Sequence, residues 1–171
     1  MAKKIENAQQ GGSTKETDPI HLEILKKIRI MIRAAQRHSL WIEKQCGVSG
    51  AQLWIMHELS EVPGLRVGEI ANKLAIHQTT TSNLLEALEK RGYVIKTRDT
   101  KDQRVVNIAL SEAGTALLLM APKPARGLLP EALRNIDEEN LTVLGKGLDA
   151  LLGSIQDMDE SFGAQPLPFT M

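Results

Sequence analysis

Charged side chains are concentrated in the stretch Arg98-Asp-Thr-Lys-Asp-Gln-Arg104. Two strand-like runs, YVIKTRD (93–99) and RVVNIAL (104–110), flank TKDQ, so the sequence predicts a hairpin with TKDQ at its tip. Lys101 lies in the tip, and Arg98 and Arg104 lie at the adjoining ends of the two runs. A guanidinium on a projecting hairpin can enter a DNA minor groove, where the negative potential is strong. Asp102, two residues before Arg104, is placed to orient it by an ion pair. The alternative is a solvated turn whose charges neutralise one another.

Two predicted helices precede this hairpin. VGEIANKLAI (67–76) is a short amphipathic helix, and QTTTSNLLEALEKRG (78–92) is a second helix that Gly92 ends. One face of the second helix should pack on the first: Thr81, Leu84, Leu85 and Leu88. The opposite face is small or polar: Thr79, Thr80, Asn83 and Ala87. Such a face suits the DNA major groove, and Gln78 at the helix N-terminus lies where backbone N–H groups favour phosphate. The alternative is an ordinary solvated face.

Cap signals place further helices on the N-terminal side. Residues 1–17 are polar and aperiodic, which predicts a mobile tail. Asp18 followed by Pro19 predicts a helix start, and apolar residues at spacings of three and four continue to about Gln45, before Gly47. Ser49, with glutamine three residues on, predicts a capping box for a helix that runs to about Ser60.

The C-terminal third predicts interrupted helices. Ser111 caps a helix that Pro122 and Pro124 should break, and Pro130 opens a further turn. Asp137 caps a last helix, whose apolar seam has spacings of three and four: Leu141, Leu144, Leu148, Leu151 and Ile155. Residues 161–171 contain two prolines and are expected to be extended. Because the first and last helices each carry an apolar stripe, we expect both to pack against a second copy in a homodimer.

The composition limits the classes of protein to which this chain can belong. The chain has 171 residues, 42% of them hydrophobic and only five aromatic, which favours one mainly helical domain with an added oligomerisation element. Net charge is zero, yet residues 66–110 hold eight Lys and Arg against five Asp and Glu, so positive charge is greatest around the predicted hairpin. No signal peptide or membrane-spanning run is recognisable, so we expect a cytoplasmic protein without membrane contact.

Catalytic and cofactor signatures are missing from the sequence. One cysteine and four scattered histidines lack metal-ligand spacing, and there is no phosphate-binding loop, GxGxxG motif or nucleophile elbow. We therefore expect no cofactor, no metal and no enzymatic activity.

Residues 48–117 resemble the MarR family (multiple antibiotic resistance regulators) of bacterial transcription factors. The resemblance rests on Leu74-Ala75-Ile76, Thr79-Thr80-Thr81, the run Leu88-Glu-Lys-Arg-Gly-Tyr-Val94, the wing pattern Asp99-x-x-Asp102-x-Arg104, and Leu110-Ser-Glu-Ala-Gly114. It implies an obligate homodimer with interleaved termini and two winged helices on a pseudo-palindromic operator in double-stranded DNA. Carried over, Arg104 is the minor-groove arginine, Asp102 orients it, and Thr79, Thr80 and Asn83 are recognition-helix contacts. The three prolines depart from the long helix that follows the wing in the family.

Many relatives respond to a small aromatic acid or phenol bound between the dimerisation and DNA-binding regions. The candidate residues for such an effector are Arg33, Arg37, His38, Trp41, Trp54 and His57, with core packing of the two tryptophans and ordinary surface positions for the polar groups as the alternative. Cys46 suggests a thiol sensor, but the partial negative charge at a helix end disfavours the reactive thiolate.

These observations together predict a mainly α fold, a winged helix-turn-helix with flanking N- and C-terminal dimerisation helices. The expected divisions are a tail (1–17), an N-terminal dimerisation helix (18–47), the DNA-binding domain (48–120), C-terminal dimerisation helices (121–160) and a second tail (161–171). The expected function is a transcriptional repressor relieved by a ligand. The alternatives are a winged helix that docks an acidic protein, and a constitutive or thiol-sensing DNA binder.

Overall fold

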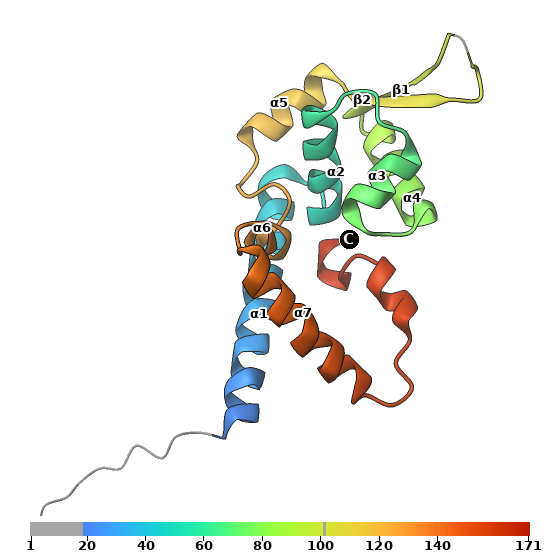
Figure 1. The fold of residues 1–171 in the computed structure, drawn as a ribbon. Helices are drawn as coiled ribbons and strands as arrows, with labels where there is room; N and C mark the ends of the chain where they lie inside the picture. The colour runs from blue at the N-terminus through green and yellow to red at the C-terminus, as the bar shows by residue number, and fades with distance from the viewer. Residues whose placement is uncertain (1–18, 101) are drawn as a thin grey trace, which may run out of the picture.

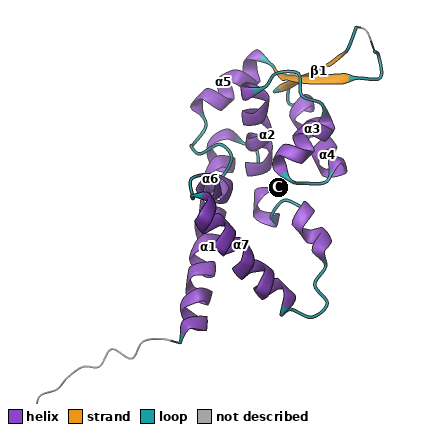
Figure 2. Ribbon diagram, viewed as in Figure 1, coloured by secondary structure: helices purple, strands orange, loops and turns teal. Residues whose placement is uncertain are grey.

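The computed structural model describes residues 19–100 and 102–171 (Figure 1). Seven α-helices, two strands and two 3-10 helices lie within these ranges: α1 (Ile20–Cys46), α2 (Gly50–Glu61), α3 (Val67–Leu74), α4 (Gln78–Lys90), β1 (Val94–Arg98), β2 (Val106–Leu110), α5 (Glu112–Met120), α6 (Leu128–Arg134), α7 (Glu138–Gly153), η1 (Glu160–Ala164) and η2 (Pro168–Thr170). Helix dominates, and the only sheet in the described part is the β1–β2 pair (Figure 2). The predicted mainly α winged helix-turn-helix is confirmed.

Helix α1 has the predicted C-terminal boundary. Gly47 follows it with φ of +66°, a left-handed conformation that favours glycine, and its N–H donates to the Glu43 carbonyl. Pro19 precedes the first helical residue instead of being that residue, and its carbonyl accepts from the N–H of Leu22 at 2.8 Å. The tail at 1–17 and the predicted cap Asp18 lie outside the described residues.

The capping box of α2 is present. Ser49 Oγ accepts from the Gln52 N–H at 3.2 Å, and Gln52 Oε1 accepts from the Ser49 N–H at 3.0 Å. Val48 and Leu53, on either side of this cap, are fully buried in the main core. Because α2 contacts α1, α3, α4, α5 and β2, it is the central element on which the others pack.

The wing follows the second helix of the helix-turn-helix. Strands β1 and β2 pair antiparallel, with Val94 opposite Leu110 and Arg98 opposite Val106. Leu65 adds a single antiparallel bridge to Ile108. The hairpin projects away from the helices, at the opposite end of the molecule from the start of α1 (Figure 1).

The prolines interrupt the chain after the wing as predicted. Ser111 Oγ accepts from the Gly114 N–H to begin α5, which ends at Met120, two residues before Pro122. Pro130 lies within the short α6, and Asp137 caps α7 by accepting from the Asn140 N–H at 2.9 Å. Helix α7 ends at Gly153, so Ile155 of the predicted seam lies beyond the helix.

The C-terminal segment differs from the expected extended tail. Residues 160–171 form η1 and η2 and turn back toward α1 and the α3–α4 turn, so the chain end lies beside the helix-turn-helix (Figure 1). Two prolines had suggested an extended chain, but Pro168 lies in the first turn of η2, where a missing N–H costs nothing.

Apolar side chains remain exposed on the two outer helices. On α1 they include Ile20, Ile24, Ile30, Met31 and Ile32. On α7 they include Val143, Leu144, Leu148, Leu151 and Leu152. Neither these helices nor any other in the described ranges is both long and apolar enough to cross a membrane.

Candidate nucleic-acid interface

Helix α4 has one buried and one exposed face, as its sequence predicted. Thr81, Leu84, Leu85 and Leu88 are buried against the core. Gln78, Thr79 and Asn83 are exposed, while Thr80 and Ala87 are half-buried. The exposed face therefore consists of small and polar groups that can approach base edges and phosphates.

The N-terminus of α4 is built by His77 and Thr81. The His77 carbonyl accepts from the Thr81 N–H at 3.0 Å and from Thr81 Oγ1 at 3.1 Å, which satisfies a hydroxyl that is fully buried. Gln78 is the first helical residue, so its side chain lies beside N–H groups that have no partner in the preceding turn of an α-helix. Together with the helix dipole, this arrangement favours a phosphate oxygen.

The wing tip is a tight, hydrogen-bonded loop. The Asp99 N–H donates to the Val105 carbonyl at 2.9 Å, and the Val105 N–H donates to the Asp102 carbonyl at 2.9 Å. Arg98 and Arg104 are exposed at the two sides of the loop. Lys101, the third predicted cation of the wing, lies outside the described residues.

Asp102 contacts Arg104 in a different way from the predicted ion pair. Asp102 Oδ1 accepts from the backbone N–H of Arg104 at 3.0 Å, and within the described ranges no ion pair joins its carboxylate to the Arg104 guanidinium. An aspartate two residues before an N–H forms this local turn readily, since its side chain is short enough to reach the backbone. Asp102 thus fixes the backbone of Arg104 and leaves the guanidinium pointing to solvent.

Two other basic residues of this region are paired with carboxylates. Lys90 Nζ lies 2.7 Å from Glu86 Oε1 on α4, and Lys96 Nζ on β1 lies 2.6 Å from Glu89 Oε2. The hydrogen bond from Lys90 holds the pKa of the Glu86 carboxyl below its usual range. These pairs reduce the net positive charge along the end of α4.

A cavity of about 220 Å³ lies between α1 and the α3–α4 turn of the helix-turn-helix. Its walls come from α1, the start of α2, the α3–α4 turn, the start of α6 and the C-terminal segment, and they are mainly apolar. Of the predicted effector residues, His38 and Trp54 line it. Trp54 packs partly buried against the core, and its Nε1 donates to Glu58 Oε1 at 3.0 Å.

A second, open hollow brings three of the predicted effector residues together. Arg37, His38 and Trp41 line it, with Ala34 and Leu128. The His38 and Trp41 rings meet edge to face with centroids 5.9 Å apart, and His38 Nε2 lies 3.0 Å from the Pro124 carbonyl oxygen. Trp41 is half-exposed rather than part of the core. Arg33 and His57 line neither hollow.

Arg126 is a cavity residue that the sequence did not reveal. It lies in the loop after the two prolines, where no periodicity marks a side chain as inward-facing, and its Nε donates to the buried Glu58 at 2.7 Å. Lys73 on α3 binds the other oxygen of Glu58 at 3.1 Å. A buried carboxylate on α2 was the available signal, because such a group requires cationic or hydrogen-bonding partners.

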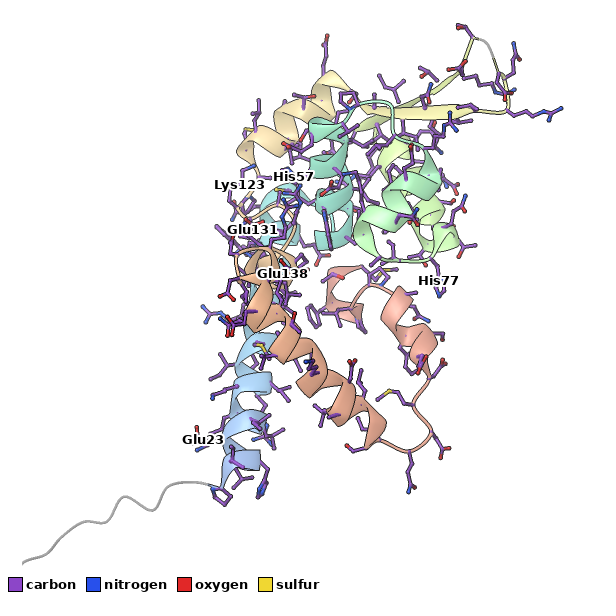
Figure 3. All side chains as sticks on the ribbon, in the orientation of Figure 1. Glu23, His57, His77, Lys123, Glu131 and Glu138 are labelled. Carbon is purple, nitrogen blue, oxygen red and sulfur yellow. The ribbon has the colours of Figure 1, made fainter. Side chains whose placement is uncertain are left out.

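Three titratable groups have pKa values set by this packing. Burial by itself raises the pKa of Glu58, but hydrogen bonds from Arg126, Lys73 and Trp54 outweigh it and hold the pKa below its usual value. Burial, followed by the charge of Arg126, lowers the pKa of His57, which Figure 3 labels. Burial raises the pKa of the Cys46 thiol, which reduces its thiolate fraction and gives no support to thiol sensing.

Comparisons with known proteins find similarity to transcriptional regulators. A sequence model described as "MarR family" matches residues 48–106. The transcriptional repressor MdtR of Bacillus subtilis is 23% identical over 85% of this chain and 94% of its own length. The structure resembles the transcriptional regulator BldR from Sulfolobus solfataricus, with a TM-score of 0.52 and 27% identity over 80% of this chain and 96% of that one. It also shares its fold with a mutant MarR from E. coli complexed with operator DNA, with a TM-score of 0.51 and 16% identity over 78% of this chain and 99% of that one.

Proposed function

The chain belongs to the MarR family, and we propose that it is a sequence-specific repressor whose binding to DNA is relieved by a small ligand. Like its relatives, it is a DNA-binding transcriptional regulator and not an enzyme. The observation that carries the proposal is an exposed polar face on α4 beside a hairpin with two exposed arginines. The repressor role is supported by the relative MdtR, which is named a repressor.

In the proposed complex, α4 enters the major groove and the wing enters the neighbouring minor groove. Gln78, Thr79, Thr80 and Asn83 contact base edges and phosphates, because they form the accessible polar start and face of the helix. Arg104 reads the narrow minor groove, and Asp102 holds the Arg104 backbone in place. Arg98 and Lys101 add phosphate contacts.

The proposed functional unit is a homodimer on a pseudo-palindromic operator. The exposed apolar faces of α1 and α7 require a partner, and a second copy supplies the same faces. Two copies of α4 then meet half-sites about one helical turn, or roughly 34 Å, apart. Bound across a promoter, such a dimer blocks the access of polymerase.

The proposed ligand occupies the cavity between α1 and the helix-turn-helix. The mainly apolar walls and small volume suit one aromatic or phenolic ring, with His38 and Arg126 as polar partners at the cavity surface. A ligand there pushes the outer helices away from the DNA-binding region, so the two α4 helices no longer match their half-sites.

Fluorescence anisotropy on DNA from upstream of the gene, against a scrambled duplex across a salt series, tests the DNA-binding part. We expect tight, sequence-preferring binding that weakens steeply as salt rises, because phosphate contacts release counterions. Equal, weak binding to every genomic duplex offered would contradict it and would favour docking to an acidic protein.

Transcription from the bound promoter with purified polymerase tests the direction of regulation. We expect less transcript as the protein is added, and recovery when a small aromatic acid such as benzoate is included at millimolar concentration. A rise in transcript on addition of the protein would overturn the repressor assignment.

A further inference from the structure

The C-terminal segment, residues 160–171, forms one wall of the cavity. Its lining residues are Gly163, Gln165, Pro166, Leu167, Phe169 and Thr170. Residues 161–171 contain no charged side chain, so this segment covers an apolar cavity without removing an ion from water. The segment is therefore chemically matched to the surface on which it lies.

Both ends of this segment are attached to elements on different sides of the cavity. The turn η2 packs on α1. Thr170 lies close to Gly50 at the start of α2: a Cβ built on this glycine would be 3.6 Å from the Thr170 Cβ. At the other end, the Ala164 carbonyl accepts a hydrogen bond from the His77 N–H at 2.8 Å. Figure 3 shows His77 at the α3–α4 turn, facing the returning C-terminal segment.

His77 connects the segment to the recognition helix α4. Its N–H is held by Ala164, while its carbonyl accepts both hydrogen bonds from Thr81 in the first turn of α4. Gln78, Thr79 and Thr80, the proposed DNA contacts, follow directly. The wall of the cavity is thus hydrogen-bonded to the residue at which the DNA-contacting helix begins.

The segment can leave this position without unfolding the domain. Residues 154–159, which join it to α7, form no helix or strand. Within the ranges described above, a single backbone hydrogen bond joins the segment to the helix-turn-helix. Its remaining backbone hydrogen bonds are internal or, for the Phe162 N–H, run to the carbonyl of the adjoining Asp159. Phe169 is only half-buried, so its release exposes a modest apolar area.

We propose that residues 160–171 are a strap that closes the cavity and holds the start of α4, and that a ligand entering the cavity displaces the strap and loosens this helix. The ligand part rests on the proposed function, whereas closure of the cavity by the strap does not. The strap links occupation of the cavity to the DNA-contacting residues through one identified bond, between Ala164 and His77.

Acrylamide quenching of Trp54 fluorescence tests the closure. In a Trp41→Phe background, Trp54 is the only tryptophan, and it lines the cavity. Phe169→Ala and a chain that ends at Asp159 should each raise the quenching constant several-fold. Phe162→Ala is the matched control, because Phe162 belongs to the same segment but is exposed and does not line this cavity. Equal quenching in all four proteins, with far-UV circular dichroism showing each folded, would overturn the proposal.

Operator binding of the same variants tests the link to α4. We expect the chain ending at Asp159 and Phe169→Ala to bind operator several-fold more weakly than wild type, and Phe162→Ala to match wild type. Increased quenching with unchanged operator affinity would show a lid without influence on α4 and would overturn this link. If the intact chain prefers no duplex, the proposed function fails, yet the quenching result still decides whether the strap closes the cavity.

Discussion

Gly114 shows why a single residue type is required where α5 meets the wing. A Cβ built on Gly114 would lie 2.0 Å from the Tyr93 carbonyl oxygen, which already accepts from the Ser111 N–H at 3.0 Å. Ser111 Oγ in turn donates to the Gly92 carbonyl at 2.6 Å. The Leu-Ser-x-x-Gly pattern is thus explained by a close backbone approach that fixes the base of the hairpin.

Gly114→Ala should lower the free energy of unfolding by about 3 kcal/mol, because the added methyl forces the backbone of Tyr93 to move. Gly68→Ala is the matched control: nothing lies within 4 Å of its Cβ position in α3, so helix propensity should make it neutral or stabilising by about 0.5 kcal/mol. Urea unfolding of both variants measures the difference. A Gly114→Ala protein as stable as wild type would show that the approach is looser than described.

Arg104 should contribute to DNA affinity and little to stability, since its side chain is exposed and its backbone alone is held by Asp102. Arg104→Ala should weaken operator binding by about 1–3 kcal/mol, as is typical of one lost groove contact. Arg134→Ala removes the same charge from α6, at an exposed site away from the wing, and should leave affinity nearly unchanged. Anisotropy titrations at one fixed salt concentration compare the operator affinities of the two variants. An equal loss of affinity in both would indicate only a general effect of charge.

At the scale of elements, Glu58 joins three segments of the described chain that no other side-chain polar contact joins to one another. Its carboxylate on α2 binds Lys73 of α3 and Arg126 of the loop before α6, and also accepts from Trp54 in the cavity wall. The Glu58 side chain is 5% exposed and that of Arg126 is 16% exposed, so solvent screens this pair weakly. The ion pairs therefore set how the cavity loop lies relative to the helix-turn-helix.

Glu58→Gln should destabilise the fold by about 3 kcal/mol at neutral pH, because it leaves the largely buried guanidinium of Arg126 without a counter-charge. The folded-state pKa of Glu58 lies below its ordinary value of 4.5, so its charge contributes full stability above that pH and loses it as pH falls through the folded-state pKa. The difference between variant and wild type should therefore shrink below about pH 4.5. Urea unfolding at pH 7 and at decreasing acid pH tests this, and a constant difference would exclude the ion pairs as its source.

Element boundaries were predictable wherever a local signal specified them. The Ser49 box, the Asp137 cap, Gly47 and the break before Pro122 depend on interactions within a few residues, which a sequence displays directly. The course of residues 160–171 and the inward position of Arg126 depend on contacts between distant segments. No periodic pattern of apolar residues in the sequence predicts such contacts. The contact of Asp102 was predicted with the correct partner residue but the wrong atom, since spacing does not distinguish a guanidinium from the backbone N–H of the same residue.

At the scale of the whole molecule, the two outer helices are the parts that the chain does not complete alone. Figure 1 shows α1 and α7 extending away from the winged helix, and their apolar side chains are exposed along that length. Exposed apolar surface of this extent is typical of an interface, whereas the core around α2 is closed without a partner. In the proposed complex, dimerisation and DNA recognition would therefore be carried by separate parts of the fold.

Leu144→Glu combined with Leu148→Glu should convert the dimer to monomers, because two carboxylates then replace the exposed apolar face of α7. Monomers reach one half-site at a time, so operator affinity should fall by roughly 100-fold or more. Thr142→Glu with Lys146→Glu is the control, since these exposed positions lie on the opposite face of the same helix and acquire the same two acids. Sedimentation velocity decides the outcome: a Leu144/Leu148 variant that sediments as a dimer would place the interface elsewhere, and α1 would then be the remaining apolar face that can form it.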